Sequence, residues 1–89
     1  MVWTIEYDPR ALQDLKKLDR TRQREILDYM TQRIGTAEDP RRFGKPLKGS
    51  KFGLWRYRVR DCRVICELQQ QRLLVLVVKI GHRSTVYDE

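Results

Sequence analysis

Residues 54–68 read LWRYRVRDCRVICEL, and the alternation of apolar and charged side chains in this stretch decides the fold. In strand periodicity the bulky apolar residues of its first half share one face: Trp55, Tyr57 and Val59. Arginines occupy the opposite face: Arg56, Arg58 and Arg60. The alternation resumes after Asp61, so the sequence predicts a β-hairpin that turns at Arg60 and Asp61.

This turn fixes the register of the predicted hairpin. It sets apolar residues opposite one another on the inward face: Val59 with Cys62, Tyr57 with Val64, and Trp55 with Cys66. The same register places Arg58 directly opposite Arg63. Like charges that face each other across a ladder cost about 0.2 to 1 kcal/mol, and a bound polyanion would relieve that cost.

Length and charge narrow the class of protein. The chain has 89 residues, enough for one small domain and too few for two, so we expect a single domain over residues 1–89. Its net charge is +7 and its pI is near 9.9, above the value of about 9 that suggests a nucleic-acid-binding domain. Partners of acidic proteins and membrane-surface peptides carry the same excess, and the balance favours a polyanion partner over incidental charge.

The sequence predicts neither a membrane segment nor a secretion signal. No apolar stretch approaches the roughly 20 residues that span a bilayer. The opening MVWTIEYDPR lacks the basic start and apolar core of a signal peptide. We therefore expect a cytoplasmic protein with no membrane partner.

The two cysteines are predicted to be small core residues. Cys62 and Cys66 are four residues apart on one strand face, which separates their Cα atoms by roughly 13 Å at about 3.3 Å per residue. A disulfide needs less than about 7 Å, so we expect none. The chain has one histidine and no second cysteine pair, so we expect no metal site.

One strand and a helical hairpin are predicted before residue 36. Residues 2–7 alternate as a strand with a bulky apolar face. Asp8 and Pro9 then signal the start of a helix, Asp19 caps a second helix, and Gly35 stops it. The buried stripe of the first helix is expected to hold Ala11, Leu12, Leu15 and Leu18. That of the second is expected to hold Ile26, Tyr29, Met30 and Ile34.

Turn-forming residues separate these helices from the hairpin. Residues 36–53, TAEDPRRFGKPLKGSKFG, contain two prolines, three glycines and five basic side chains, which predicts a long loop. After a turn of three glutamines at 69–71, residues 72–80 form a near-continuous apolar run, typical of a strand buried on both faces, which we take as the central strand. The remaining GHRSTVYDE, 81–89, is a polar tail.

The predicted order is strand, helix, helix, strand, strand, strand. This order indicates an α+β fold, with a small, mainly antiparallel sheet and the helical hairpin packed on one of its faces. The first strand is available to pair with the last strand or with an edge. The other face of the sheet is expected to be free and to present Arg56, Arg58 and Arg63.

At this point the motifs resemble a known family. The segment PLKGSKFGLWRYRVRDCRVIC, 46–66, with the apolar strand and the IGHRSTVY of 80–87, is similar to the RelE/ParE superfamily of bacterial and archaeal toxins from toxin–antitoxin pairs. The likeness covers nearly the whole chain. Membership of the RelE branch implies a ribosome-dependent endoribonuclease that cuts messenger RNA in the ribosomal A site. The alternatives are a ParE-like gyrase-inhibiting toxin without nuclease activity, or a non-catalytic RNA-binding module of the same fold.

The resemblance also implies site residues and partners. In RelE-like enzymes basic residues lie on the hairpin strands, with a late arginine and a tyrosine close behind it. The matching positions here are Arg56 and Arg58, where those enzymes commonly carry lysine, and then Arg63, Arg83 and Tyr87. The implied partners are a RelB-like antitoxin with an acidic segment, the ribosome and messenger RNA, with operator DNA bound through the antitoxin. No cofactor is implied.

These residue types suit RNA cleavage without a metal. The 2′ hydroxyl attacks the adjacent phosphate, which requires a base, cations for the added charge and a partner for the departing 5′ oxygen. Acidic residues are scattered, with no clustered pair to hold magnesium. Hairpin guanidinium groups suit a phosphate clamp. Arg83 is assigned charge stabilisation, because guanidinium does not deprotonate. Tyr87 has a reference pKa of about 10, which nearby arginines would lower.

Several residues have two interpretations. His82 has a reference pKa suited to acid–base work near pH 7, so it is either catalytic or a loop histidine facing solvent. Tyr87 is either the base or a packing aromatic. A further basic set would bind RNA phosphates or only aid solubility: Arg60, Lys45, Lys48 and Lys51.

Overall fold

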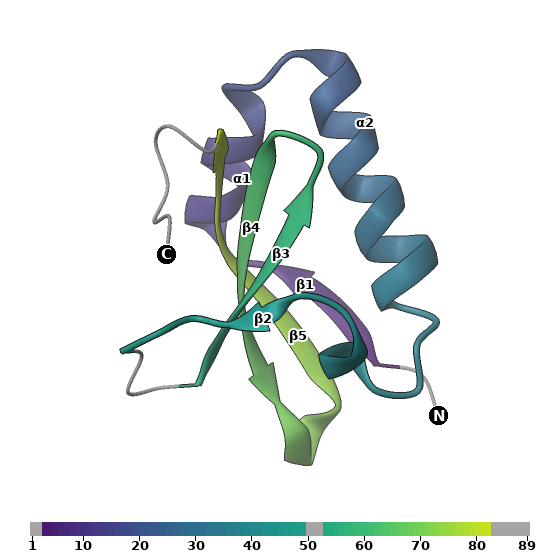
Figure 1. The fold of residues 1–89 in the computed structure, drawn as a ribbon. Coiled ribbons are helices and arrows are strands. Elements are labelled where there is room, and N and C mark those ends of the chain that lie inside the picture. The colour runs from purple at the N-terminus through teal and green to yellow at the C-terminus, as the bar shows by residue number, and fades with distance from the viewer. Residues whose placement is uncertain (1–2, 50–52, 83–89) are drawn as a thin grey trace.

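The computed structural model describes residues 3–49 and 53–82 as two helices against a five-stranded sheet (Figure 1). The strands are β1 (Thr4–Tyr7), β2 (Lys45–Pro46), β3 (Leu54–Val59), β4 (Cys62–Gln69) and β5 (Leu74–His82). The helices are α1 (Pro9–Lys16) and α2 (Arg20–Asp28), and α2 continues into a π-helical turn at Tyr29–Ile34. Short 3₁₀ turns lie at Pro40–Arg42 and Gln70–Arg72.

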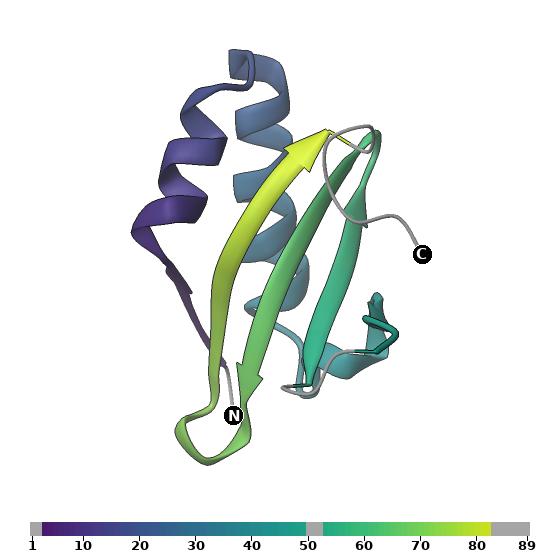
Figure 2. The same cartoon turned by 90° about the vertical axis from the view of Figure 1, so that its left-hand side faces the viewer.

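The sheet has the order β1-β5-β4-β3-β2. β1 pairs with β5 in parallel, and every other pair is antiparallel, which confirms the predicted α+β class. Both helices lie on one side of the sheet (Figure 2). The prediction that the last strand is central is wrong: β5 is an interior strand between β1 and β4, while β4 occupies the middle. Because β1 pairs only with 74–77, Lys79 of β5 is exposed rather than buried.

The hairpin has the predicted register. Val59 pairs with Cys62 across the turn, and Arg58 pairs with Arg63. Tyr57 and its partner Val64, in the middle of the inward row, have no exposed surface. Both cysteines are buried and free, as expected of small core residues.

Capping residues start both helices where the sequence predicts. A side-chain oxygen of Asp8 accepts a hydrogen bond from the Arg10 amide at 2.9 Å, and Asp19 accepts one from the Arg22 amide at 2.8 Å. The second helix ends at Gly35, whose amide donates to the Met30 carbonyl at 2.7 Å and closes the π turn.

The buried stripe of α1 is narrower than predicted. Ala11 and Leu15 are buried, but Leu12 is 43% exposed. At about 100° per residue, Leu12 lies a quarter-turn from the line through Ala11 and Leu15 that meets the sheet. On the second helix the prediction is confirmed, since Ile26 and Met30 have no exposed surface.

The segment before the hairpin is not the continuous loop that its prolines and glycines suggested. It contains the 3₁₀ turn Pro40–Arg42 and the edge strand β2. The backbone turns into β2 at Gly44, which has φ +71°, and Lys45 then pairs with Arg56. In residues 3–49 and 53–82 no helix is long and apolar enough to cross a membrane.

A candidate nucleic-acid interface on the sheet

Three arginines share the sheet face that lies away from the helices, and we call them the arginine face: Arg56, Arg58 and Arg63. Their neighbours along β3 and β4, among them Tyr57 and Val64, point the other way into the core beneath the helices. Because successive side chains on a strand alternate between faces, the arginines must point outward. The structure thus brings together three of the residues that the sequence singled out.

The arginine face is less open than predicted. Arg58 is exposed, but Arg56 and Arg63 retain only 7% and 4% of their accessible surface. The three arginines also differ in their strand neighbours. Arg56 is flanked by β2 and β4, and Arg63 by β3 and β5, whereas β2 ends before it reaches the level of Arg58.

Two lysines extend the arginine face along one row of the sheet. Lys45, which the sequence placed in a loop, pairs with Arg56; Arg56 pairs with Ile65, and Ile65 pairs with Lys79. Directly paired residues project from the same face, so this row carries three cations across four strands. Sequence reasoning missed Lys79, although a lysine inside an otherwise apolar run was the available signal.

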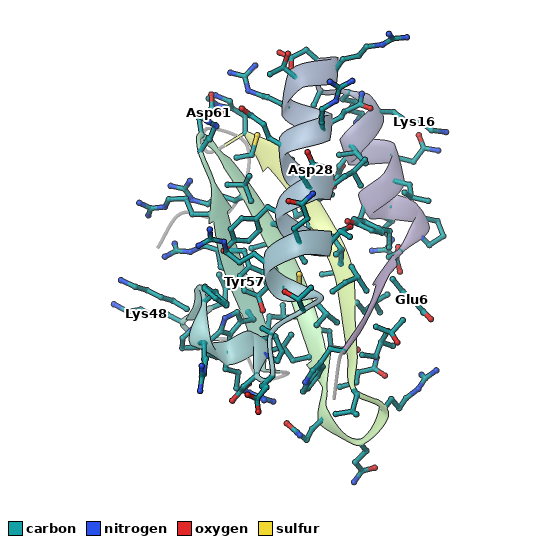
Figure 3. The ribbon with its side chains drawn as sticks, turned by 90° about the vertical axis from the view of Figure 1, so that its right-hand side faces the viewer. Glu6, Lys16, Asp28, Lys48, Tyr57 and Asp61 are labelled. Carbon is teal, nitrogen blue, oxygen red and sulfur yellow. The ribbon has the colours of Figure 1, made fainter. Side chains whose placement is uncertain are left out.

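The remaining basic candidates lie elsewhere. Lys48 is exposed in the turn that follows β2 and points away from the body of the molecule (Figure 3). Arg60 occupies the hairpin turn with φ 55°, and its Nε lies 2.8 Å from a carboxylate oxygen of Glu25 on α2. It therefore leans toward the helix rather than onto the arginine face.

Asp61 joins three segments at the hairpin turn. Its two carboxylate oxygens accept hydrogen bonds from Arg22 of α2, from Nε at 3.1 Å and from Nη2 at 2.6 Å. The Nε2 of His82 lies 3.1 Å from Oδ2 of the same carboxylate. These two hydrogen bonds from the Arg22 guanidinium hold the pKa of the Asp61 carboxyl well below its usual range. Figure 3 shows Asp61 at the end of the hairpin, beside the helix.

The sequence placed His82 in a polar tail, and the structure corrects this. It is the last residue of β5 and pairs with Cys62 next to the hairpin turn. Its ring lies against Asp61 rather than projecting from a loop. Three other predicted site residues lie outside the described residues: Lys51, Arg83 and Tyr87.

The buried tyrosines and the buried cysteine thiol among the described residues are poorly suited to act as bases. Burial raises the pKa of Tyr7 to about 12, and burial also raises the pKa of Tyr29 and Tyr57. The Cys66 thiol, too, has a pKa raised by burial. Among residues 3–49 and 53–82, no group of three or more acidic, histidine or cysteine side chains is placed to hold a metal ion. This arrangement can bind and neutralise phosphate.

Comparison with known proteins shows which toxins and toxin–antitoxin complexes this chain is similar to. Toxin RelG of Mycobacterium tuberculosis is 23% identical over 87 residues, covering 98% of both chains. A toxin–antitoxin complex of the same organism, RelBE2, matches 93% of this chain and all of the matched chain, with a TM-score of 0.84 and 22% identity. The RelE–RelB complex of Pyrococcus horikoshii matches 97% of this chain and all of the matched chain, with a TM-score of 0.73 and 19% identity.

The two structural matches establish the fold, since they share so few identical residues. A separate match is decisive for the family. Residues 5–87 match the family described as the ParE toxin of type II toxin–antitoxin systems. Because this match spans nearly all of the 89 residues, the chain belongs to that toxin family, within the RelE/ParE superfamily that its motifs resemble.

Proposed function

We propose that this toxin is a ribosome-dependent endoribonuclease that cuts messenger RNA in the ribosomal A site. The observation that carries the proposal is the pair Arg58 and Arg63, two like charges held directly opposite each other, with Arg56 two residues away. Like charges directly opposite each other on a ladder repel. A phosphate bound between the two guanidinium groups turns the repulsion into attraction.

The arginine face would bind the messenger backbone and stabilise the charge that develops at the cleaved phosphate. Residues two apart on a strand are roughly 6.6 Å apart, close to the spacing of successive phosphates. Arg56 and Arg58 therefore suit neighbouring phosphates, with guanidinium forks that each bind two oxygens. Arg63 would neutralise the phosphorane charge after the 2′ hydroxyl has attacked, and Arg83 the departing 5′ oxygen. Tyr87 is our candidate for the base.

Dependence on the ribosome follows from what the arginine face lacks. The arginine face itself carries phosphate-binding cations and no acid or base, so positioning of the RNA would come from elsewhere. The ribosome would present the A-site codon in a cleavable geometry. A second basic set would contact ribosomal RNA phosphates: Lys45, Lys48, Lys51 and Arg60.

We further propose a RelB-like antitoxin as the controlling partner. The structural relatives from Mycobacterium tuberculosis and Pyrococcus horikoshii are toxin–antitoxin complexes. A short chain with a net charge of +7 binds nucleic acid indiscriminately unless an acidic segment covers it. The complex would then bind operator DNA through the antitoxin.

Gyrase inhibition is the second candidate function, because the matching family is described by its ParE toxins. In that case the arginine face would not be a nuclease site. The two functions differ in the molecule attacked, so purified target systems separate them.

In a purified translation system, the toxin is expected to cut messenger RNA only when ribosomes are present. Primer extension would reveal a new end within the A-site codon, and ribosome-free messenger would stay intact at the same toxin concentration. The same preparation should leave gyrase supercoiling unaffected. Equal cleavage of naked messenger would contradict the ribosome dependence, and inhibition of supercoiling without any cleavage would favour the second candidate.

A further inference from the structure

A β-bulge decides which face of the sheet Lys79 occupies. The register of β4 with β5 pairs Cys66 with Val77 and Ile65 with Lys79, so Val78 is an extra residue between two paired positions. Strict alternation would point Lys79 to the same side as Val77, which lies in the core. The extra residue shifts the alternation by one position. Lys79 therefore projects from the same side of the sheet as the arginine face.

The burial of β5 agrees with this shift. Ile80 is 2% exposed, pairs with Val64 and belongs to the core, whereas Lys79 is exposed. Bulges often re-aim a side chain next to a functional site. Here one bulge in an otherwise apolar strand delivers a cation to the face that already carries three arginines.

Charge on this face changes from one row of paired residues to the next. The first row carries Arg58 and Arg63 and ends on β5 at Gly81, which has no side chain. The second row is the one that Lys79 shares with Arg56. The third row has two leucines, two carboxylates and no cation, and we call it the acidic row: Leu54, Glu67, Leu76 and Glu6. A polyanion is attracted to the first two rows and repelled at the third.

The Lys79 ammonium is open to a ligand. Within residues 3–49 and 53–82, no carboxylate forms an ion pair with it, whereas Arg22 and Arg60 near the hairpin turn each have a carboxylate partner. Two strand spacings, about 10 Å, separate Lys79 from Arg56 along their row. The flexible four-carbon stem of a lysine lets its charge follow a backbone phosphate over that range.

We propose that Lys79 binds a backbone phosphate of single-stranded RNA. Beyond Arg56 this RNA crosses the strands over Ile65 to β5, instead of continuing along β3 toward the acidic row. The inference deepens the proposed ribonuclease function by giving the messenger a direction on the sheet. It rests on that function only for its effect on cleavage, because RNA binding is measurable without ribosomes.

Three substitutions test the proposal with matched changes of charge. Lys79→Met removes the charge and keeps a long side chain. Lys16→Met is its control, because Lys16 is exposed on α1, projects away from the sheet (Figure 3) and takes the same charge from the chain. Glu67→Gln removes one carboxylate of the acidic row and keeps an oxygen that accepts the hydrogen bond from Gln69.

The first test measures binding of a short single-stranded RNA whose 2′ hydroxyls are methylated, so that it cannot be cut. Fluorescence anisotropy over a range of salt concentrations gives both the affinity and its salt dependence. Lys79→Met should weaken binding about 3- to 10-fold at low salt and reduce the slope of log K against log salt by about 0.7, the share of one single-strand phosphate contact. Lys16→Met should stay within about twofold with an unchanged slope. Glu67→Gln should tighten binding about two- to threefold.

The second test measures ribosome-dependent cleavage by the same variants. Lys79→Met should raise KM about 3- to 10-fold and leave kcat within about twofold, because Lys79 holds the RNA away from the reacting phosphate. Lys79→Arg keeps the charge and should restore KM. A variant of the charge-stabilising arginines would instead lower kcat.

The outcomes separate the two proposals. RNA binding that depends on Lys79, with no cleavage on ribosomes by the wild type, would refute the proposed function and leave this inference standing. Unchanged affinity and slope in Lys79→Met would overturn the inference. So would equal weakening by Lys16→Met, because net charge alone would then account for the effect. Binding that Glu67→Gln does not tighten would overturn the direction assigned to the RNA.

Discussion

Arg58→Ala is expected to lower ribosome-dependent cleavage by about 100-fold or more, the usual effect of removing one charge-stabilising donor. The fold should remain as stable as before or become slightly more stable. Arg58 is exposed, so its removal leaves no cavity, and it ends the repulsion with Arg63 across the ladder. That repulsion costs about 0.2 to 1 kcal/mol. Cleavage rates and melting temperatures of the purified proteins would check both halves of this expectation.

Arg24→Ala is the matched control for Arg58→Ala. Arg24 is exposed on α2, on the helical side of the molecule, and its loss changes the net charge equally. It should leave cleavage essentially unchanged. Arg58→Lys keeps the positive charge and should retain most of the activity. A lower melting temperature with full cleavage in Arg58→Ala would show that Arg58 is structural.

Arg63 is a less clean target for the same experiment. Arg63 retains only 4% of its accessible surface, so truncation removes packing as well as charge. Arg63→Ala should therefore lose cleavage and also some stability. The contrast between Arg58 and Arg63 could not be drawn from the alternation alone, which treats the two residues alike.

Gly44→Ala is expected to destabilise the fold by about 2 to 4 kcal/mol. An alanine at φ +71° costs about 1 kcal/mol by itself. In addition, its Cβ would overlap the carbonyl oxygen of Arg56 and lie 2.8 Å from Cδ1 of Tyr57 and 2.9 Å from Nε1 of Trp55. Relief of such overpacking typically costs a further 1 to 3 kcal/mol or so. Urea denaturation would measure the change, and β2 should separate from β3 as a consequence.

Gly49→Ala is the control for Gly44→Ala, because it introduces the same backbone strain without the close contacts to β3. Gly49 has φ +73°, nearly the same backbone conformation, but a Cβ there would meet nothing within 4 Å. It should cost only about 1 kcal/mol, which corresponds to roughly 4 to 8 °C in a domain of this size. Equal destabilisation by the two substitutions would show that strain in the backbone, rather than contact with β3, accounts for the effect.

Local signals in the sequence predicted much of this fold. The register of the hairpin follows from strict alternation on both sides of a two-residue turn, because a slip of one residue would bury Arg56 and Arg58 in the core. The helix starts follow from Asp8 and Asp19, whose side chains satisfy amides in the first turn. Such features depend only on neighbours in the sequence.

Features that depend on distant segments could not be predicted. β4 and β5 change register between Ile65 and Cys66, and that shift determines which residues share a row with Lys79. β2 is only two residues long, too short for any periodicity, yet it aligns Lys45 with Arg56.

The burial of the arginines also depends on distant segments. So do the contacts of Asp61. Arg56 and Arg63 are buried at positions where their strands have neighbours on both sides. The contact of Asp61 with Arg22 and His82 joins residues 39 and 21 positions apart. No local pattern encodes contacts over these separations.

The chemistry of the cut ends tests the central claim most directly. Attack by the 2′ hydroxyl, with charge stabilised by arginines, leaves a 5′ hydroxyl on one fragment and a 2′,3′-cyclic or 3′ phosphate on the other. Fragments cut on ribosomes should therefore be labelled by polynucleotide kinase without prior phosphatase treatment. Fragments with a 5′ phosphate and a 3′ hydroxyl would mean that water attacks the phosphate, and would contradict the account.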